Sequence, residues 1–510
     1  MKQSSGAVCL RGMRGLYALV CLAILAVLMP PVRAQQQPHT VRALFVSDVH
    51  FEPFWDPGKV ARLAAASERE WQDILEAAPS PDRAQRFAAL EKSCHMRGAD
   101  TSYPLLAAAI SAMKERAGGA RIVTVSGDLI AHQFDCKYKA LFPTAEPEDY
   151  RALVEKTIAF VISELQRVAP DARLYVALGN NDSDCGDYQL DAGGQFLADV
   201  SRFVLRDLPE RQRVEGMEFF RQGGYYSVML QAPVEHTRLL VLNDVLLSPK
   251  HTNCARTPDA APGDAELLWL ERQLDAARAA KENVWVMGHI PPGVDAYSTL
   301  SRGVKCPAKP PVMFLATDKL AQELTGSGDE IRLGIFAHAH TDEIKLLEPP
   351  APVANDAAPG ADAEASTKPA ARAIAVKMVP SISPVNGNNP AFTIAEVDPA
   401  SGGLADYRVF AAPNPSGTGE WAELYDFDRT YGEKSFSAAA VQRVLGEFAA
   451  DRAATSAASQ SYVHSFLTGR PDILLPLVWP EYVCTLSHVT ASGYTDCACP
   501  EVQPSPAEPR

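Results

Sequence analysis

The sequence lacks the features that mark several common classes of protein. None of its ten cysteines forms a Cys-x-x-Cys pair, which argues against a thiolate zinc site. Positive charge is scarce, because 48 lysines and arginines stand against 62 aspartates and glutamates, for a net charge of -14. This balance argues against a protein that binds nucleic acid by neutralising phosphates. An acidic surface still permits phosphate chemistry, since bound metal ions would supply local positive charge.

The N-terminus has an apolar stretch, but a short one. Basic residues precede the stretch from Leu16 to Met29, which falls below the roughly 20 residues of a transmembrane helix. Small residues then offer a cleavage site before Gln35. We expect residues 1–34 to be a signal peptide that exports the chain to a periplasmic, extracellular or lumenal compartment. No stable membrane span is expected after cleavage; an uncleaved anchor is the alternative.

The remaining cysteines predict disulfides. Eight lie beyond the signal segment, and an even number in an exported chain is typical of disulfide pairing. Two of them are separated by a single residue and are too close to pair with each other, so one of these is expected to pair with Cys484. The eight are Cys94, Cys136, Cys185, Cys254, Cys306, Cys484, Cys497 and Cys499.

Short apolar runs alternate with amphipathic stretches from Val41 onward. This alternation predicts an α/β fold with a largely parallel sheet and right-handed crossovers. Residues 347–373 differ, because Ala, Pro and Asp dominate and no apolar periodicity remains, which predicts a disordered surface insertion. Strands are expected over 42–47, 121–125, 173–178, 225–230, 238–242, 284–287 and 331–336, and helices over 59–78 and on to 92, 102–116, 147–168, 266–281 and 438–450.

Five of the expected strands end in metal-binding side chain types. Ligands of open α/β sheets gather beyond the carboxyl ends of the strands, so these ends can meet in one crevice. Imidazole, carboxylate and amide oxygen together suit divalent transition metals. Each fragment alone is a weak signal, but the ordered set predicts a metal site with Asp128 at its middle. The five ends are Asp48-x-His50, Gly127-Asp128, Gly179-Asn180, Gly288-His289 and His338-x-His340.

The ordered set resembles the calcineurin-like metallophosphoesterases over roughly residues 42 to 345. The version Gly127-Asp128-x-x-Ala131-His132 is similar to the acid sphingomyelinase-like branch, as are Cys94 with Tyr103-Pro104-Leu105 and the stretch Val379 to Ser383. The resemblance implies a four-layer α/β/β/α sandwich of two mixed sheets. A metallophosphoesterase domain would cover 35–399, and a small helical, disulfide-bearing extension would cover 400–510. No saposin-like module precedes the domain.

The resemblance also implies two divalent metal ions with Asp128 as the bridging ligand. Two adjacent ions can lower the pKa of a shared water and hold both oxygens of an in-line displacement at phosphorus. The family favours zinc, while the ligand types also permit iron or manganese. One ion would be held by Asp48, His50, Asp128 and His340, and the other by Asp128, Asn180, His289 and His338.

One position departs from the family pattern. The usual Gly-Asn-His-Asp/Glu motif carries a histidine that assists the leaving group, and Asn181 stands there in this chain. Endopolyphosphatase-like relatives resemble this Gly-Asn-Asn-Asp version. Asparagine delivers no proton, so His132 becomes the expected proton donor or phosphate contact, with a polar loop residue as the alternative reading. Asp182 is expected to brace Asn180 or to cap a turn, and Asn243 to contact substrate or to form a turn with Asp244.

The resemblance therefore implies an exported hydrolase of phosphodiesters or phosphoanhydrides that works by attack of a metal-activated hydroxide on phosphorus. A sphingomyelin-like lipid, a nucleotide and polyphosphate are all candidate substrates. Two alternatives stay open. The first is a phosphomonoesterase or nucleotidase, and the second is a non-catalytic exported binding protein that retains the metal site.

Overall fold

Two six-stranded mixed sheets form the centre of the molecule in the computed structural model, which describes residues 40–303, 309–349 and 372–500. The first has the order β12-β11-β10-β1-β2-β3 and the second β4-β5-β6-β7-β9-β8. The strands are β1 (Val41–Val46), β2 (Ile122–Ser126), β3 (Arg173–Ala177), β4 (Tyr226–Met229), β5 (Thr237–Val241), β6 (Asn283–Met287), β7 (Ile331–Phe336), β8 (Glu343–Leu347), β9 (Ile374–Met378), β10 (Ala391–Val397), β11 (Leu404–Ala411) and β12 (Ala422–Asp426).

The strands at the middle of each sheet are parallel and buried on both faces. In the first sheet β1, β2 and β3 run parallel, while β10 pairs antiparallel with β1. In the second sheet β5, β6, β7 and β9 run parallel. Every residue of β2 is buried, which explains why its sequence is a continuous β-branched run and not an alternating pattern. The carboxyl ends of these parallel strands carry the predicted site residues.

The two sheets pack against each other through aromatic side chains. The rings of Phe45 on β1 and Trp285 on β6 meet edge to face with their centroids 6.2 Å apart. The Tyr226 hydroxyl on β4 reaches across to the first sheet, where it hydrogen-bonds both backbone groups of Val176 at 3.0 Å. These contacts hold the strands of one sheet in a fixed position relative to those of the other.

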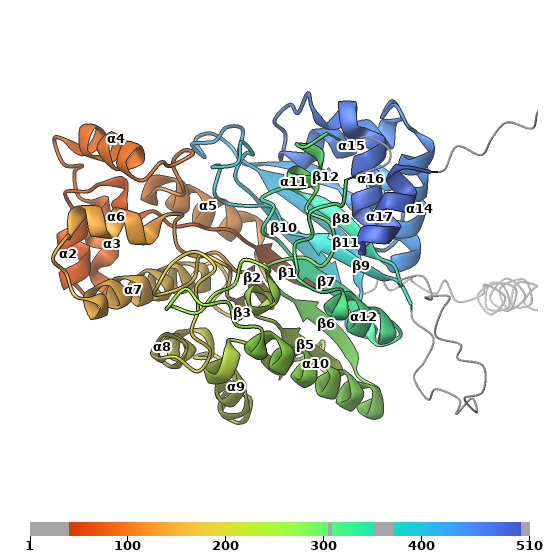
Figure 1. The fold of residues 1–510 in the computed structure, drawn as a ribbon, viewed down its shortest axis with the longest axis horizontal. Helices are drawn as coiled ribbons and strands as arrows, with labels where there is room; N and C mark the ends of the chain where they lie inside the picture. Colours follow the sequence, from red (N-terminus) through yellow and green to blue (C-terminus); the bar gives the residue numbers. More distant parts are fainter. Residues whose placement is uncertain (1–39, 304–308, 350–371, 501–510) are drawn as a thin grey trace, which may run out of the picture. The chain divides into compact units, whose positions relative to one another are not determined.

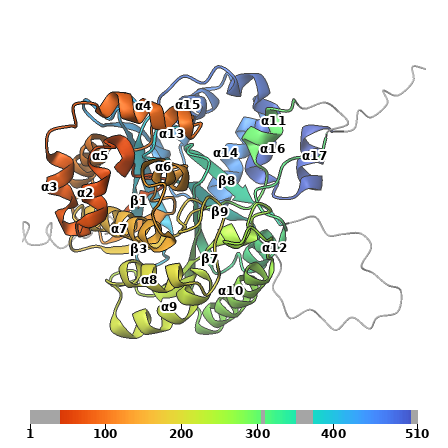
Figure 2. The ribbon, with the colours of Figure 1, turned by 60° about the vertical axis from the view of Figure 1, so that its left-hand side comes forward.

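Helices cover the outer faces of both sheets (Figures 1 and 2), which confirms the four-layer α/β/β/α arrangement. Contacts join α5 to β10 of the first sheet, and α10, α14 and α16 to strands of the second. The helices are α2 (Val60–Ala65), α3 (Trp71–Glu76), α4 (Arg83–Ser93), α5 (Tyr103–Arg116), α6 (Phe134–Leu141), α7 (Pro147–Gln166), α8 (Gln195–Val204), α9 (Glu210–Gly223), α10 (Ala261–Ala280), α11 (Ala296–Leu300), α12 (Lys319–Gly326), α13 (Phe427–Tyr431), α14 (Ala438–Ala450), α15 (Ala457–Phe466), α16 (Trp479–Ser487) and α17 (Ala491–Ala498), with 3₁₀ turns η1 (Pro53–Trp55), η2 (Glu68–Glu70), η3 (Asp244–Leu247) and η4 (Leu475–Val478).

The expected helix over 59–78 is wrong as a single element. It ends at Ala65, and Ser67 with Glu70 forms a capping box that starts a new turn before α3. A capping box satisfies the free backbone amides at the start of a helix. A new helical turn therefore begins at Ser67, and α2 does not continue through it.

The predicted boundary at residue 399 falls inside the first sheet. Strand β11 pairs antiparallel with β10, and β12 pairs with β11, so two strands beyond that boundary complete the sheet. The described residues from Thr40 onward group as one compact unit. The C-terminal helices therefore follow a sheet that already includes part of the expected extension.

Within the described residues, three disulfides with both cysteines placed link residues predicted to pair. They join Cys94 to Cys136, Cys185 to Cys254, and Cys484 to Cys497, the last as expected for the C-terminal tail. Cys306, the predicted signal peptide and residues 350–371 of the predicted insertion lie outside the described residues. No helix of the described residues is long and apolar enough to cross a membrane.

Candidate metal centre

The five predicted strand ends converge on one buried site. Three overlapping groups of side chains have potential ligand atoms within 4.8 Å of one another. Asp128 belongs to two of these groups and therefore lies between them. The groups are Asp48 with His50 and Asp128, Asp128 with His289 and His338, and His50 with His132 and His340.

The backbone at this site is left-handed at five of the seven predicted metal ligands. Their φ angles lie between 43° at His50 and 72° at His338. Residues other than glycine rarely adopt this region, and such strained positions cluster at functional sites. Backbone hydrogen bonds hold the strain in place, since His50 N donates to Asp128 O at 2.9 Å. The five residues are Asp48, His50, Asp128, His338 and His340.

Glycine at position 179 allows two of the strand ends to approach closely. A Cβ atom there would lie 2.2 Å from Oδ1 of Asp128 and 2.4 Å from its backbone nitrogen. Any side chain at Gly179 would therefore push the loop after β3 away from the loop after β2. The glycines beside the ligands are needed for convergence as well as for the turns themselves.

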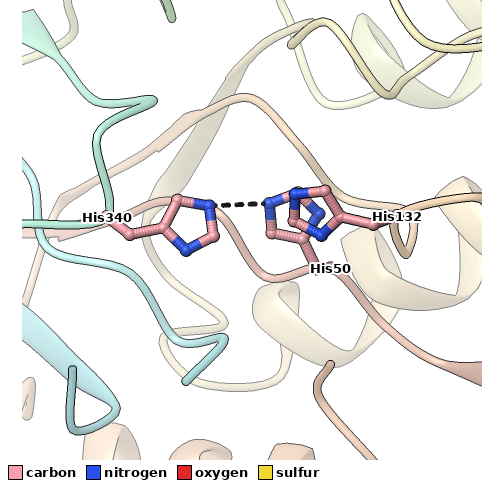
Figure 3. A group of neighbouring side chains, drawn as sticks. All are labelled: His50, His132 and His340. Carbon is pink, nitrogen blue, oxygen red and sulfur yellow. Dashed lines mark hydrogen bonds between the residues drawn. The ribbon is translucent and has the colours of Figure 1, made fainter. Parts of the chain in front are cut away.

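The first half of the site brings together His50, His340 and Asp48. The Nε2 atoms of His50 and His340 lie 3.1 Å apart, and Nδ1 of His50 hydrogen-bonds the Ile130 carbonyl at 3.0 Å. Figure 3 shows the His340 ring facing the stacked rings of His50 and His132. Both carboxylate oxygens of Asp48 are buried and accept no hydrogen bond within the described residues, although Oδ1 lies 3.4 Å from Nε2 of His340. Buried polar atoms are normally satisfied, so this pair fits oxygen ligands of a cation.

The second half is built around His289. Its Nδ1 hydrogen-bonds the Ser126 carbonyl at 2.7 Å, which turns Nε2 toward the centre of the site. That Nε2 lies 3.1 Å from Oδ1 of Asn180, 3.2 Å from Nδ1 of His338 and 3.2 Å from Oδ2 of Asp128. Four potential ligand atoms from four different strand ends thus face one point.

The electrostatics of the site favour positive charge at its centre. Burial disfavours a charged imidazole, yet Asp128 and Asp48 raise the pKa of His50 to about 9. Asp128 likewise overcomes burial at His289 and raises its pKa to about 10. Burial also opposes ionisation of Asp128, but His289 and His50 hold its pKa well below the usual range. The buried carboxylates thus bind positive charge, which is what divalent cations would supply.

His132 lies directly against the first half of the site. Its ring stacks on that of His50 with centroids 3.9 Å apart and lies 5.7 Å from that of His340. The buried carboxylate of Asp100 holds both its ring Nδ1, at 3.0 Å, and its backbone amide, at 2.9 Å. Because Asp100 occupies Nδ1, the second ring nitrogen, Nε2, is available to the site. The sequence analysis missed Asp100, although it lies only three residues before the quoted Tyr103, where α5 begins.

We expect Asp100→Asn to lower turnover about tenfold while leaving the metal content unchanged, because it weakens the hold on His132 but touches no predicted ligand. The measurement is turnover of two diesters, one with a p-nitrophenol leaving group and one with an alkoxide. The alkoxide ester should suffer more, since it needs more help from a proton donor. An equal loss on both esters would mean that Asp100 supports the fold and not His132.

Asn181 and Asp182 form hydrogen bonds that fix the position of Asp128 and of the two loops beside it. The backbone N and side-chain Nδ2 of Asn181 donate to the two oxygens of Asp128 at 2.8 and 2.9 Å. Asp182 accepts hydrogen bonds from the amides of Gly179 and Leu129 at 2.9 and 2.8 Å, which ties the loop after β3 to the loop after β2. Asp182 was expected to brace Asn180 or to cap a turn, and it binds these backbone amides. The side chain of Asn180 is held by another acid.

That acid is Asp187, which the sequence analysis missed. Its Oδ1 accepts a hydrogen bond from Nδ2 of Asn180 at 2.7 Å, so the amide oxygen of Asn180 turns toward His289. Asn243 does not reach the site, because its Nδ2 donates to the Gly223 carbonyl at 2.7 Å. Its neighbour Asp244 does contribute, since it accepts the backbone amide of His289 at 2.9 Å.

Comparisons with known proteins point to one family. No protein-family model matches the chain. It is 26% identical over 406 residues to the human acid sphingomyelinase-like phosphodiesterase 3b, which covers 78% of this chain and 80% of that protein. Sphingomyelinase phosphodiesterase D of Dictyostelium discoideum is 26% identical over 346 residues, covering 66% of each chain. A cyclic GMP-AMP phosphodiesterase of Bos taurus is 21% identical over 350 residues, covering 66% of this chain and 70% of that protein.

A similar solved structure is a dimetal phosphatase from Danio rerio. It is 13% identical, covers 78% of this chain and 99% of its own, and has a TM-score of 0.35. A TM-score this low carries no argument about the family. The comparison therefore rests on the sequence relatives and on the ordered strand-end motifs of this chain. The chain is similar to acid sphingomyelinase-like phosphodiesterases, and this similarity supports the resemblance to the calcineurin-like metallophosphoesterases that the ordered motifs indicate.

Proposed function

We propose that this protein is an exported, metal-dependent hydrolase of phosphodiesters or phosphoanhydrides. The observation that carries the proposal is the position of Asp128, which is shared by two groups of side chains, one of which also contains the buried carboxylate of Asp48. A carboxylate between two sets of ligands, one with Asp48 and two imidazoles and the other with two imidazoles and an amide, suits a pair of divalent ions. One ion would be held by Asp48, His50, Asp128 and His340, and the other by Asp128, Asn180, His289 and His338.

Zinc fits this donor set best, because imidazole nitrogens supply four of the seven ligands and the rest are oxygens. Iron and manganese fit the same donors. When bound, two such ions would lower the pKa of a coordinated water and offset the charge of a phosphate. Asn181 would fix the orientation of the Asp128 carboxylate, since it donates one hydrogen bond to each of its two oxygens.

His132 is the proposed proton donor to the leaving oxygen. Its ring lies beside the first half of the site, and its Nδ1 is engaged by Asp100, so Nε2 can hold the proton that is transferred. Its side chain is 27% exposed, whereas that of His50 is fully buried, so substrate can reach it. Asparagine at position 181 faces Asp128 and does not compete for this role.

The names of the relatives favour a diester as substrate. Two of them are described as sphingomyelinase or acid sphingomyelinase-like phosphodiesterases and one as a cyclic GMP-AMP phosphodiesterase. A sphingomyelin-like lipid, a nucleotide and polyphosphate are therefore the substrates to test. The disulfides of the described residues suit an oxidising compartment, which supports the export predicted from residues 1–34.

The test compares bis-p-nitrophenyl phosphate with p-nitrophenyl phosphate on the full-length, metal-loaded protein. We expect the diester to turn over faster, and chelation to remove turnover of both, with recovery when metal is restored. Faster turnover of the monoester would favour a phosphomonoesterase or nucleotidase. A protein that binds metal but hydrolyses neither compound, nor any of the substrates named above, would favour a binding protein.

A further inference from the structure

Two loops beside the candidate metal centre are joined into a single rim. The first loop follows β3 and carries Tyr188, and the second follows η3 and carries Lys250. The disulfide between Cys185 and Cys254 links them. Backbone pairing adds to this link, since Thr252 N donates to Tyr188 O at 3.1 Å. The rim is therefore held in place relative to the strand ends.

Tyr188 contacts two of the predicted metal ligands. Its backbone amide donates to the Asn180 carbonyl at 2.9 Å, and its hydroxyl lies 3.1 Å from Nε2 of His338. The other ring nitrogen of His338, Nδ1, faces His289 at 3.2 Å. If Nδ1 is the ligand atom, Nε2 carries the ring proton and donates it to the Tyr188 hydroxyl.

Lys250 completes this arrangement from the solvent side. Its Nζ donates to the Tyr188 hydroxyl at 3.4 Å and lies 4.7 Å from the centre of the Tyr188 ring. A hydroxyl has two acceptor lone pairs and one hydrogen. With His338 and Lys250 both donating to it, the hydrogen of Tyr188 is free to point to a ligand.

The charge of Lys250 is also free to act on a ligand. Lys250 is exposed, and its ammonium forms no salt bridge with any residue that the structure describes. The acid on the same rim, Asp187, accepts the hydrogen bond from Asn180 and interacts electrostatically with Lys250 without forming a salt bridge to it. One cation and one hydroxyl donor thus lie next to the second half of the site, two hydrogen bonds from His338.

We propose that Lys250 and the Tyr188 hydroxyl form an anion subsite that binds a second phosphate of the substrate, next to the phosphate that is hydrolysed. This inference rests on the proposed function and narrows it to phosphoanhydrides, such as nucleoside triphosphates and polyphosphate. A rim of this charge disfavours a substrate whose remaining group is a cation, as in a choline phosphodiester, because like charges repel. Lys250 would determine specificity, and the strand-end ligands would hold the reacting phosphate.

The test measures binding to the full-length, metal-loaded protein by titration calorimetry. The probes are imidodiphosphate, which has two phosphates joined by nitrogen, and orthophosphate, which has one. For Lys250→Ala we expect imidodiphosphate to bind about tenfold more weakly, the loss typical of a charge-assisted hydrogen bond. The binding of orthophosphate should weaken much less. The variant Lys250→Arg should retain most of the affinity for imidodiphosphate. Lys319→Ala is the control, since Lys319 is 60% exposed and pairs with Asp264 on α10.

Three outcomes would overturn the subsite. If Lys250→Ala weakens the binding of both probes equally, Lys250 contributes a general electrostatic attraction for anions and not a second phosphate site. If the variant binds imidodiphosphate as tightly as the wild type does, while the wild type still hydrolyses bis-p-nitrophenyl phosphate, the subsite is wrong and the proposed function stands. If the wild type binds neither probe and hydrolyses no diester, both fail together.

Discussion

Replacing Asp128 with asparagine should reduce the metal content from about two ions per chain to less than one. The substitution keeps the size of the side chain and removes the one negative charge shared by both halves of the site. Turnover should fall by at least about a thousandfold, because each tenfold step corresponds to about 1.4 kcal/mol and metal ions contribute several kcal/mol to the transition state. Metal analysis and diester turnover on the same preparation check both expectations.

Asp264→Asn is the matched control for this substitution. Asp264 lies in the first turn of α10 with its side chain 61% exposed, so removal of its charge should change neither metal content nor turnover. If Asp128→Asn retains two ions and only loses turnover, Asp128 is not the shared ligand, and the buried carboxylate of Asp48 becomes the stronger candidate.

His132→Ala should lower diester turnover by about a hundred- to a thousandfold and leave the metal content unchanged. The ring of His132 stacks on His50 and is held by Asp100, but no predicted ligand depends on it for a hydrogen bond. The loss should be larger for an alkoxide leaving group than for p-nitrophenolate, since a poor leaving group needs the proton more. This difference separates a proton donor from a residue that only packs against the site.

His464→Ala controls for the loss of an imidazole elsewhere, because His464 is exposed on α15. Unchanged turnover in His132→Ala would remove His132 from the mechanism. A large fall in metal content would instead make it an additional ligand, which its grouping with His50 and His340 permits geometrically. Asn181→His is a useful companion, since a histidine there would replace the amide that now binds Asp128.

Sequence patterns predicted the strand ends well, because each depends on a short local signal. A β-branched run followed by glycine and a polar residue marks the end of a buried strand, and β2 with Gly127 and Asp128 follows that rule. The ordering of five such ends then predicted which side chains meet. The break before α3 had a local signal too, the Ser67–Glu70 capping box, which the reading from helical periodicity passed over.

The supporting contacts were missed because they join distant parts of the chain. Asp100 and His132 are 32 residues apart in sequence, and Tyr188 and His338 are 150 apart. No periodicity or spacing links such pairs, and the contact between Tyr188 and His338 also joins loops from two different sheets. Asn181 stands where the family motif has the histidine that assists the leaving group, and the turn after β3 directs its side chain to Asp128.

The most direct test of the metal centre is the metal content of the purified full-length protein, measured by inductively coupled plasma mass spectrometry before and after chelation. The arrangement of Asp48, Asp128 and their imidazole partners predicts about two divalent ions per chain, lost on chelation together with diester turnover. Restoring zinc, iron or manganese should restore both. Fewer than one bound ion per chain in protein that still hydrolyses diesters would contradict a dinuclear centre.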